Sequence, residues 1–251
     1  RQRQMCIRDR VAGLAATFGR GSMTNHYCDM QNADVILTIG SNNVENHPVS
    51  SKWVQRALDN GATWIVVDPR YTRSAEMADI YCPIRSGTDI AFYGGLFNYI
   101  LEHDLWQHEY VLNYTNASYL LDEEYSFDVE TGIFSGFDKD SATYDAKTWH
   151  YQVESTKEWD TSEGGAYAWA KAEGVPEFTP PTVEVPKRDM TLQDPMCVFQ
   201  QMKKHYSRYD LDTVSATCGM DKELLEKVYA TYAATGAPDK SGTILYLSLI
   251  H

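Results

Sequence analysis

Short apolar runs and helical periodicity alternate in the first part of the chain. Two runs rich in β-branched residues, 35–39 and 64–67, lie about 30 residues apart. Between them, one apolar helix face would be formed by Trp53, Val54, Ala57 and Leu58. Ser50 or Ser51 could cap this helix, and Gly61 follows its end. The pattern is typical of a βαβ unit, so we expect a parallel sheet flanked by helices.

Helical periodicity returns toward the end of the chain. Pro195 opens a segment whose apolar positions are Val198, Phe199, Met202 and Tyr206. Asp221 could cap a second helix, which ends at Gly236 and carries Leu224, Leu225, Val228, Tyr229 and Tyr232. Residues 243–246 then predict another buried strand. Together these elements predict an α/β fold with a Rossmann-like parallel sheet.

Polar residues follow each predicted strand directly. The first strand is followed by Gly40, Ser41, Asn42 and Asn43, and the second by Asp68, Pro69 and Arg70. The segment 84–89 then opens a further helix. Ligands of parallel sheets bind at the carboxyl ends of the strands, which favours a nucleotide-like cofactor here. The alternative is that these residues only make turns and end strands. The usual G-x-G-x-x-G fingerprint of nicotinamide and flavin sites is missing.

The negative charge is concentrated in one segment. The chain carries a net charge of −13, and residues 102–165 hold fifteen acidic residues against three lysines, a balance of −12. Hydrophobic periodicity is weak there, so we expect either a solvated surface insertion or a docking surface for a partner subunit. Nucleic-acid binding is disfavoured, because phosphate contacts need a basic patch. No apolar run approaches the length of a membrane span.

The cysteines do not form a cluster motif. The five cysteines are Cys6, Cys28, Cys82, Cys197 and Cys218, and no two are spaced C-x-x-C. We expect the last four to be buried apolar residues, and no iron–sulfur cluster or other metal site within the chain.

Several blocks carry a resemblance to a known family. They are residues 11–26, 33–34, 45–48, 67–70, 84–89, 114–118, 187–192, 207–209 and 241–246. In these blocks the chain resembles the catalytic alpha subunits of membrane-associated formate dehydrogenases of the N and O type. These subunits belong to the molybdopterin oxidoreductase, or dimethyl sulfoxide reductase, family. The hexamer Ile84–Asp89 is the more specific match, whereas Val67–Arg70 recurs across the superfamily.

The resemblance implies a cofactor and its contacts. The family binds bis-molybdopterin guanine dinucleotide with molybdenum or tungsten. By that pattern Gly40, Ser41, Asn42 and Asn43 would contact a pyrophosphate, and Asp68, with Pro69 and Arg70, a ribose. The guanine would be enclosed by Ser86, Gly87, Thr88 and Asp89, because a carboxylate can accept from the base N1–H and amino group together. Asp89 could also cap the helix that would begin at Ile90. Arg70, Arg73 and Arg85 could screen phosphate charge or pair with nearby acids.

The resemblance also implies an activity. It predicts oxidation of formate to carbon dioxide, with two electrons passing through a 4Fe-4S cluster to an iron–sulfur beta subunit and a membrane cytochrome b gamma subunit. The parent would be periplasmic and held at the membrane by these partners. The long acidic segment favours this branch. The alternatives are a soluble NAD-linked formate dehydrogenase, another molybdopterin oxidoreductase, or a non-catalytic dinucleotide-binding module.

Both ends of the chain depart from the family pattern. Residues 1–10 and 247–251 resemble translated adapter sequence, which predicts an internal fragment with no catalytic or metal-ligating residue of its own. Cys6 coincides with the position of the family's cysteine or selenocysteine ligand. Ile7, however, stands where the family has a histidine, so we expect Cys6 not to bind metal. Between the ends we expect an α/β domain at 11–113, an acidic insertion at 114–190 and a helical return to the α/β domain at 191–246.

Overall fold

The computed structural model describes residues 25–158 and 182–245. The expectations for Cys6, for residues 1–24 and for residues 247–251 lie outside the described residues. The chain divides into two compact units. The first, called here the sheet unit, comprises residues 1–107 and 206–251, and the second unit comprises residues 108–205.

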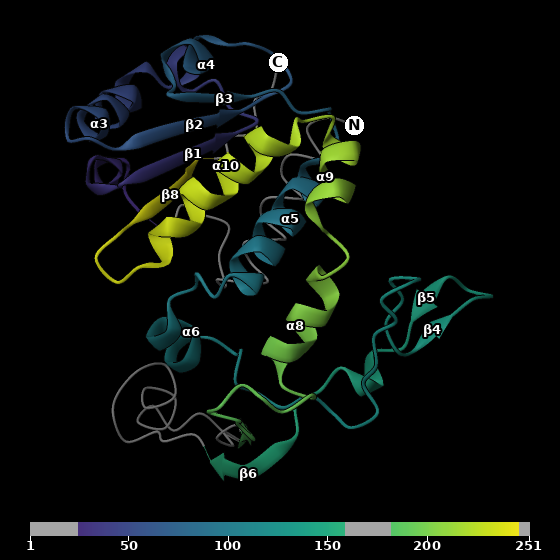
Figure 1. The fold of residues 1–251 in the computed structure, drawn as a ribbon. Coiled ribbons are helices and arrows are strands. Elements are labelled where there is room, and N and C mark those ends of the chain that lie inside the picture. Colours follow the sequence, from purple (N-terminus) through teal and green to yellow (C-terminus); the bar gives the residue numbers. More distant parts are fainter. Residues whose placement is uncertain (1–24, 159–181, 246–251) are drawn as a thin grey trace, which may run out of the picture. The chain divides into compact units, whose positions relative to one another are not determined.

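The sheet unit is built on four parallel strands (Figure 1). They are β1 (Val35–Ile39), β2 (Thr63–Val67), β3 (Ile80–Cys82) and β8 (Gly242–Leu245), in the order β3-β2-β1-β8. The predicted α/β fold with a parallel sheet is confirmed, and the predicted last strand pairs with β1. Strands 35–39 and 63–67 are buried almost throughout, which is why they read as continuous apolar runs.

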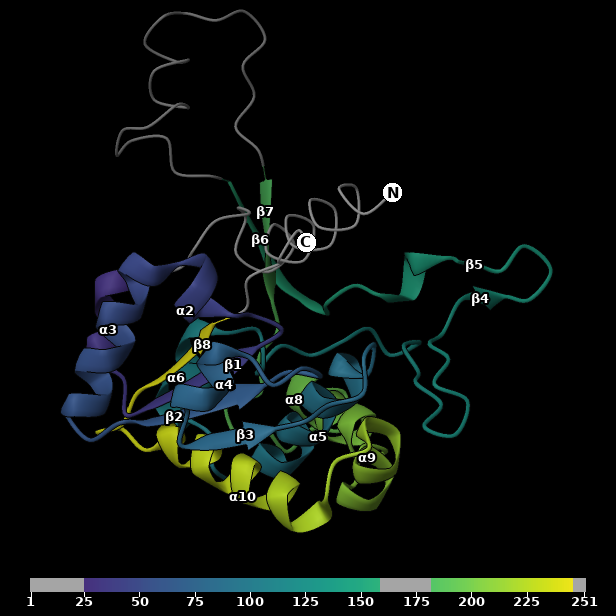
Figure 2. The same cartoon turned by 90° about the horizontal axis from the view of Figure 1, so that it is seen from above.

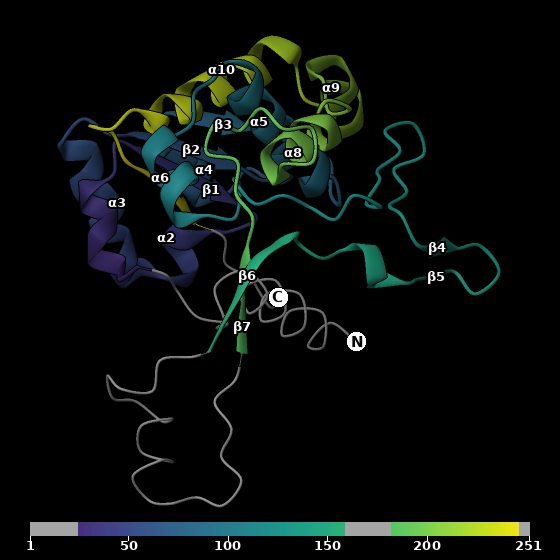
Figure 3. The ribbon, with the colours of Figure 1, turned by 90° about the horizontal axis from the view of Figure 1, so that it is seen from below.

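Helices cover both faces of this sheet. On one face α5 (Asp89–Glu102), α9 (Leu211–Cys218) and α10 (Lys222–Ala233) pack on Leu37, Ile65 and Val67. On the other, η1 (Tyr27–Asn32), α3 (Pro48–Asp59) and α4 (Arg73–Met77) pack on Ile36, Trp64 and Val66. Figures 2 and 3 show the sheet between α3 and α10. Because side chains alternate along a strand, β1, β2 and β3 supply residues to both cores.

The helix ends test the predicted caps. Asp221 caps α10 as expected, and its carboxylate accepts from the Glu223 and Leu224 N–H groups. The expected cap of α3 was wrong. The helix begins at Pro48 because proline already has the backbone angle of the first helical position and needs no N–H partner there. Ser50 and Ser51 instead lie in the first turn and donate to the His47 carbonyl.

The second unit contains short elements. They are α6 (His108–Tyr114), β4 (Phe137–Asp138), β5 (Thr143–Tyr144), η2 (Ala146–Thr148), β6 (Val153–Glu158), β7 (Thr182–Pro186) and the start of α8 (Val198–Tyr206). Strands β4 and β5 pair antiparallel, as do β6 and β7. Among the described residues of 102–157, every acidic side chain is exposed except Asp122, which is half-buried. The expected solvent exposure of the acidic segment is confirmed there.

Two successive hairpins in this unit repeat one pattern. Phe127 pairs with Phe134, and ten residues later Phe137 pairs with Tyr144. In each hairpin an aspartate, Asp128 or Asp138, accepts from the backbone two residues on and from a hydroxyl three residues on. These hydrogen bonds lower the pKa of both carboxyls, the hydroxyl contributing most. Local aspartate turns therefore order a segment with weak hydrophobic periodicity.

Two further expectations concern cysteines and membrane spans. Cys82, Cys197 and Cys218 are buried as expected, whereas Cys28 is only half-buried. Burial raises the pKa of Cys82 to about 12, so its thiol stays protonated at neutral pH. Across residues 25–158 and 182–245, every helix is too short or too polar to cross a bilayer.

Candidate functional site at the carboxyl edge of the sheet

The carboxyl ends of β1 and β2 bring two predicted site segments together. The Gly40 N–H donates to the Val67 carbonyl at 3.0 Å, and the Asp68 N–H donates to the Cys82 carbonyl at 3.2 Å. Gly40 and Asp68, which directly follow β1 and β2, therefore still form a backbone hydrogen bond with the adjacent strand. Gly40 has a φ of 58°, a left-handed conformation that glycine adopts without strain. A Cβ there would meet no atom within 4 Å, so the space above Gly40 is open.

The Asn42 and Asn43 side chains are already engaged within the protein. The Asn42 amide accepts from Ser74 Oγ at 3.0 Å and donates to Glu45. The Asn43 amide accepts from Ser50 Oγ at 2.9 Å and donates to Ser51 Oγ at 3.3 Å. Both residues are almost fully buried. Their amides therefore brace the turn after β1 against α3 and α4, as the turn interpretation expected.

Ser41 stands apart in this turn. It is fully buried, and its Oγ has no hydrogen-bond partner. Within the described residues, the backbone N–H groups of Ser41 and Asn42 donate no hydrogen bond either. Buried polar groups without partners are rare and call for a specific explanation. A ligand rich in acceptor oxygens, such as a phosphate, would supply the missing partners.

Asp68, which the sequence resemblance predicts to contact a ribose, also stabilises the turn after β2. It is 8% exposed, and its Oδ1 accepts from the Arg70 N–H at 2.8 Å, which turns the chain after β2. Its carbonyl accepts from the Tyr81 hydroxyl at 3.0 Å. Burial and then the Asp68 charge raise the pKa of Tyr81, so this hydroxyl remains a donor at neutral pH. Pro69 and Arg70 are exposed at the same edge.

The neighbouring arginines are committed to protein groups. Arg73 pairs with Glu45 at 3.2 Å on the surface. Arg85 points to the end of α9, where its Nη1 donates to the Thr217 carbonyl at 2.9 Å. The ion-pairing interpretation is confirmed for Arg73. Arg85 caps a helix, which neither of the two sequence interpretations anticipated.

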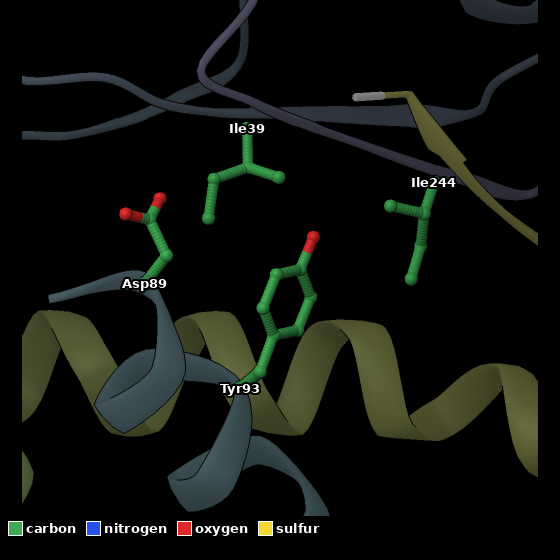
Figure 4. Close-up of a pocket in the computed structure, with 4 residues that line it drawn as sticks. All are labelled: Ile39, Asp89, Tyr93 and Ile244. Atoms are coloured by element: carbon green, nitrogen blue, oxygen red, sulfur yellow. The ribbon is translucent and has the colours of Figure 1, made fainter. Parts of the chain in front are cut away.

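Asp89 lines a pocket at the end of β1 (Figure 4). The pocket has a volume of about 360 Å³, and its walls are Ile39 of β1, Ile244 of β8, and Asp89 and Tyr93 of α5. Figure 4 shows the Asp89 carboxylate and the Tyr93 ring facing the two isoleucines. The Asp89 carboxylate forms no hydrogen bond within the described residues, unlike that of Asp68.

The expected alternative role of Asp89 needs correction. The helix begins at Asp89 and not at Ile90, and Thr88 occupies the cap position without a side-chain cap. Asp89 is thus the first helical residue. Its negative charge suits the positive end of the helix dipole, but it does not cap the helix by a hydrogen bond.

The predicted site residues therefore form two groups. Residues 40–43 and 68–70 share the edge formed by β1 and β2, whereas 86–89 lead from β3 into α5 on the face covered by α9 and α10. Hydrogen bonds link the first group to α3 and α4, and the second to Cys218 of α9 through the Thr88 carbonyl. Sequence reasoning missed Tyr93, although its position four residues after Asp89 places both on one helix face.

No metal centre accompanies these groups in the described part of the chain. There, no three histidine, cysteine or acidic side chains lie close enough together to hold a metal ion.

Comparison with known proteins identifies the class. Residues 4–105, which include β1, β2, β3 and all of α5, match the molybdopterin oxidoreductase family model. Acetylene hydratase from Pelobacter acetylenicus has a similar fold, with a TM-score of 0.53 over 97% of this chain and 21% of that one, at 22% identity. The sequence match identifies a molybdopterin oxidoreductase domain within residues 4–105, and the structural neighbour supports the fold alone.

Closer relatives define the branch. The chain is 51% identical over 236 residues to the formate dehydrogenase alpha subunit of Megalodesulfovibrio gigas. It is 45% identical over 237 residues to the nitrate-inducible formate dehydrogenase major subunit of Escherichia coli K12. Each alignment covers 94% of this chain and 20% of the relative. The chain is therefore homologous to formate dehydrogenase alpha subunits over most of its length, and it spans about one fifth of theirs.

Proposed function

We propose that the chain is part of a formate dehydrogenase catalytic subunit that oxidises formate to carbon dioxide. The observation that carries this proposal is the 51% identity that extends over 236 residues. The F420-dependent formate dehydrogenase alpha subunit of Methanocaldococcus jannaschii, by contrast, aligns over 107 residues, or 43% of the chain. Similarity to the Megalodesulfovibrio gigas and Escherichia coli subunits therefore extends well beyond a shared dinucleotide-binding sheet. This favours the respiratory branch of formate dehydrogenases over the F420-dependent one.

The cofactor of this proposal is bis-molybdopterin guanine dinucleotide. Its fit is supported by the Ser41 hydroxyl and by the N–H groups of Ser41 and Asn42, which have no partner among the described residues and would donate to pyrophosphate oxygens. Asp68 would accept from a ribose hydroxyl, with Pro69 and Arg70 beside it. Gly40 and Asn43 would shape the turn. When bound, the molybdenum or tungsten centre would take up the two electrons of formate.

The guanine end would lie at Asp89. This carboxylate has no hydrogen bond within residues 25–158 and 182–245 and lines an otherwise apolar pocket, which suits a flat base that offers two adjacent donors. Ser86, Gly87 and Thr88 would form the turn against which the base rests. We propose two partners, an iron–sulfur beta subunit that takes electrons from a 4Fe-4S cluster and a membrane cytochrome b gamma subunit, at the periplasmic face.

A chimaera tests the guanine assignment. Residues 11–246 would replace the aligned segment of the Megalodesulfovibrio gigas alpha subunit, and GMP released by acid hydrolysis would report bound dinucleotide. We expect Asp89→Ala to lower GMP content severalfold, because each lost charge-assisted hydrogen bond costs about 1.5–3 kcal/mol. Asp140→Ala, an exposed acidic residue of the second unit, is the matched control. Unchanged GMP in Asp89→Ala would rule out this placement of the base.

A further inference from the structure

The turn before Asp89 is attached to the end of a distant helix. The Arg85 N–H donates to the Cys218 carbonyl at 2.8 Å. Arg85 Nη1 donates to the Thr217 carbonyl at 2.9 Å and to the Ala216 carbonyl at 3.4 Å. These are the last carbonyls of α9, which have no partner within their own helix. Arg85 thus satisfies three of them and places its positive charge at the negative end of the helix dipole.

A second set of contacts closes the turn from the other side. The Cys218 thiol donates to the Thr88 carbonyl at 3.7 Å, and Thr88 Oγ1 donates to the Arg85 carbonyl at 2.7 Å. Burial raises the pKa of Cys218, so the thiol keeps its proton and remains a donor. The backbone from Arg85 to Thr88 is therefore held at both ends by the last turn of α9.

Gly219 leaves the space that this arrangement needs. It follows α9 in the left-handed conformation with a φ of 67°. A Cβ at this position would lie 3.2 Å from Arg85 Nη2. A larger residue would thus carry backbone strain and press on the guanidinium.

We propose that Arg85 is a positioning residue, which fixes the turn 86–88 on the end of α9 and so aims the Asp89 carboxylate into its pocket. The inference rests on the proposed function, since it takes the ligand of the pocket to be a guanine base. The Arg85 guanidinium donates to the carbonyls of Ala216 and Thr217 and does not contact the ligand. Its contribution is geometric, because a carboxylate meets N1–H and the 2-amino group together only in one orientation.

Base selectivity of the 251-residue chain is the measurement. GDP and IDP differ only in the 2-amino group, and their dissociation constants can be compared by calorimetry. We expect the unsubstituted chain to prefer GDP about tenfold, the value of one such hydrogen bond. Asp89→Ala should abolish this preference. Arg85→Ala should reduce it below about twofold, and Arg85→Lys should give an intermediate value, because one ammonium cannot span the same carbonyls.

Two further variants separate positioning from general stability. Gly219→Ala should reduce the preference for GDP over IDP, as Arg85→Ala does, although the Arg85 side chain is still present. Arg56→Ala is the control, since Arg56 is exposed on α3 and stacks on Trp53 of its own helix. Thermal unfolding would show which variants are folded. A ratio of affinities does not depend on the folded fraction, so a merely structural role of Arg85 would leave the preference unchanged.

The outcomes distinguish the two proposals. If Arg85→Lys and Gly219→Ala keep the full preference while Asp89→Ala loses it, the positioning role of Arg85 is wrong and the guanine site stands. If the unsubstituted chain binds GDP and IDP equally, Asp89 is not a guanine site, and both proposals fail.

Discussion

At the scale of single residues, Ser41 is the part of the candidate site that the fold itself does not explain. Its neighbours Asn42 and Asn43 have side-chain partners from α3 and α4, but the Ser41 hydroxyl is buried without one. A buried hydroxyl that stabilises the fold would form a hydrogen bond within the protein. This is the reason for proposing that Ser41 donates to a bound ligand.

Ser41→Ala tests that interpretation. We expect the free energy of unfolding of the chain to change by less than about 0.5 kcal/mol, because no internal hydrogen bond is lost. The GMP content of the chimaera should nevertheless fall, since a bond to a charged phosphate is worth about 1.5–3 kcal/mol. Ser50→Ala is the contrasting control, because its Oγ donates to Asn43 and His47 and its loss should destabilise the fold. A loss of stability without a loss of GMP in Ser41→Ala would contradict the expectation.

At the scale of elements, the sequence pattern predicted those helices and strands whose formation depends on residues close together in the chain. The apolar runs gave β1 and β2, and the aspartate before a periodic segment gave α10 with its cap, because these signals lie within a few residues. The start of α3 was missed because the serines were given more weight than Pro48. Ser74, which donates to Asn42, and Thr217, which accepts from Arg85, lie 32 and 132 residues away in the chain, so these contacts depend on tertiary packing and have no local signal.

The packing of α5 against α10 makes its own prediction. The Tyr229 hydroxyl donates to the Phe92 carbonyl at 2.6 Å in the core, where burial raises the pKa of the phenol far above its usual range. Tyr229→Phe keeps the ring and removes this bond, so it should lower the free energy of unfolding by about 1 kcal/mol. Tyr232→Phe is the matched control on the same helix and should be nearly neutral. Equal stability of the two variants in urea denaturation would show that the hydrogen bond contributes nothing.

The loop after β7 predicts a pH dependence. The Asp189 carboxylate accepts from Thr191 and from the backbone of Gln193 and Asp194, and these bonds lower its pKa to about 2. Its stabilising effect should be complete above about pH 4 and disappear as pH falls toward 2, because only the ionised form is favoured by folding. Asp189→Asn should cost about 1 kcal/mol at pH 7, after discounting for solvent screening. The difference in the free energy of unfolding from the unsubstituted chain, measured by urea denaturation between pH 2 and pH 7, should vanish near pH 2.

At the scale of the whole molecule, the two units differ in charge as well as in structure. Most of the excess negative charge lies in residues 102–165, where the described carboxylates except that of Asp122 are exposed, while the candidate cofactor residues lie in the sheet unit. Acidic side chains within the site would repel a dinucleotide that carries its own phosphates, and this repulsion would be strong at low dielectric. The distribution of charge thus supports placing the cofactor at the sheet edge.

The last prediction concerns activity, which should need more than this chain. The chain aligns with about one fifth of each formate dehydrogenase subunit that it resembles. We therefore expect the purified 251-residue chain to reduce no dye with formate, because the residues that would hold the metal and the cluster are expected in the remaining four fifths. The chimaera with the Megalodesulfovibrio gigas subunit should be active, and its rate should follow its molybdenum or tungsten content. Formate-dependent dye reduction by the chain alone, in proportion to bound metal, would refute this expectation and place the catalytic residues within it.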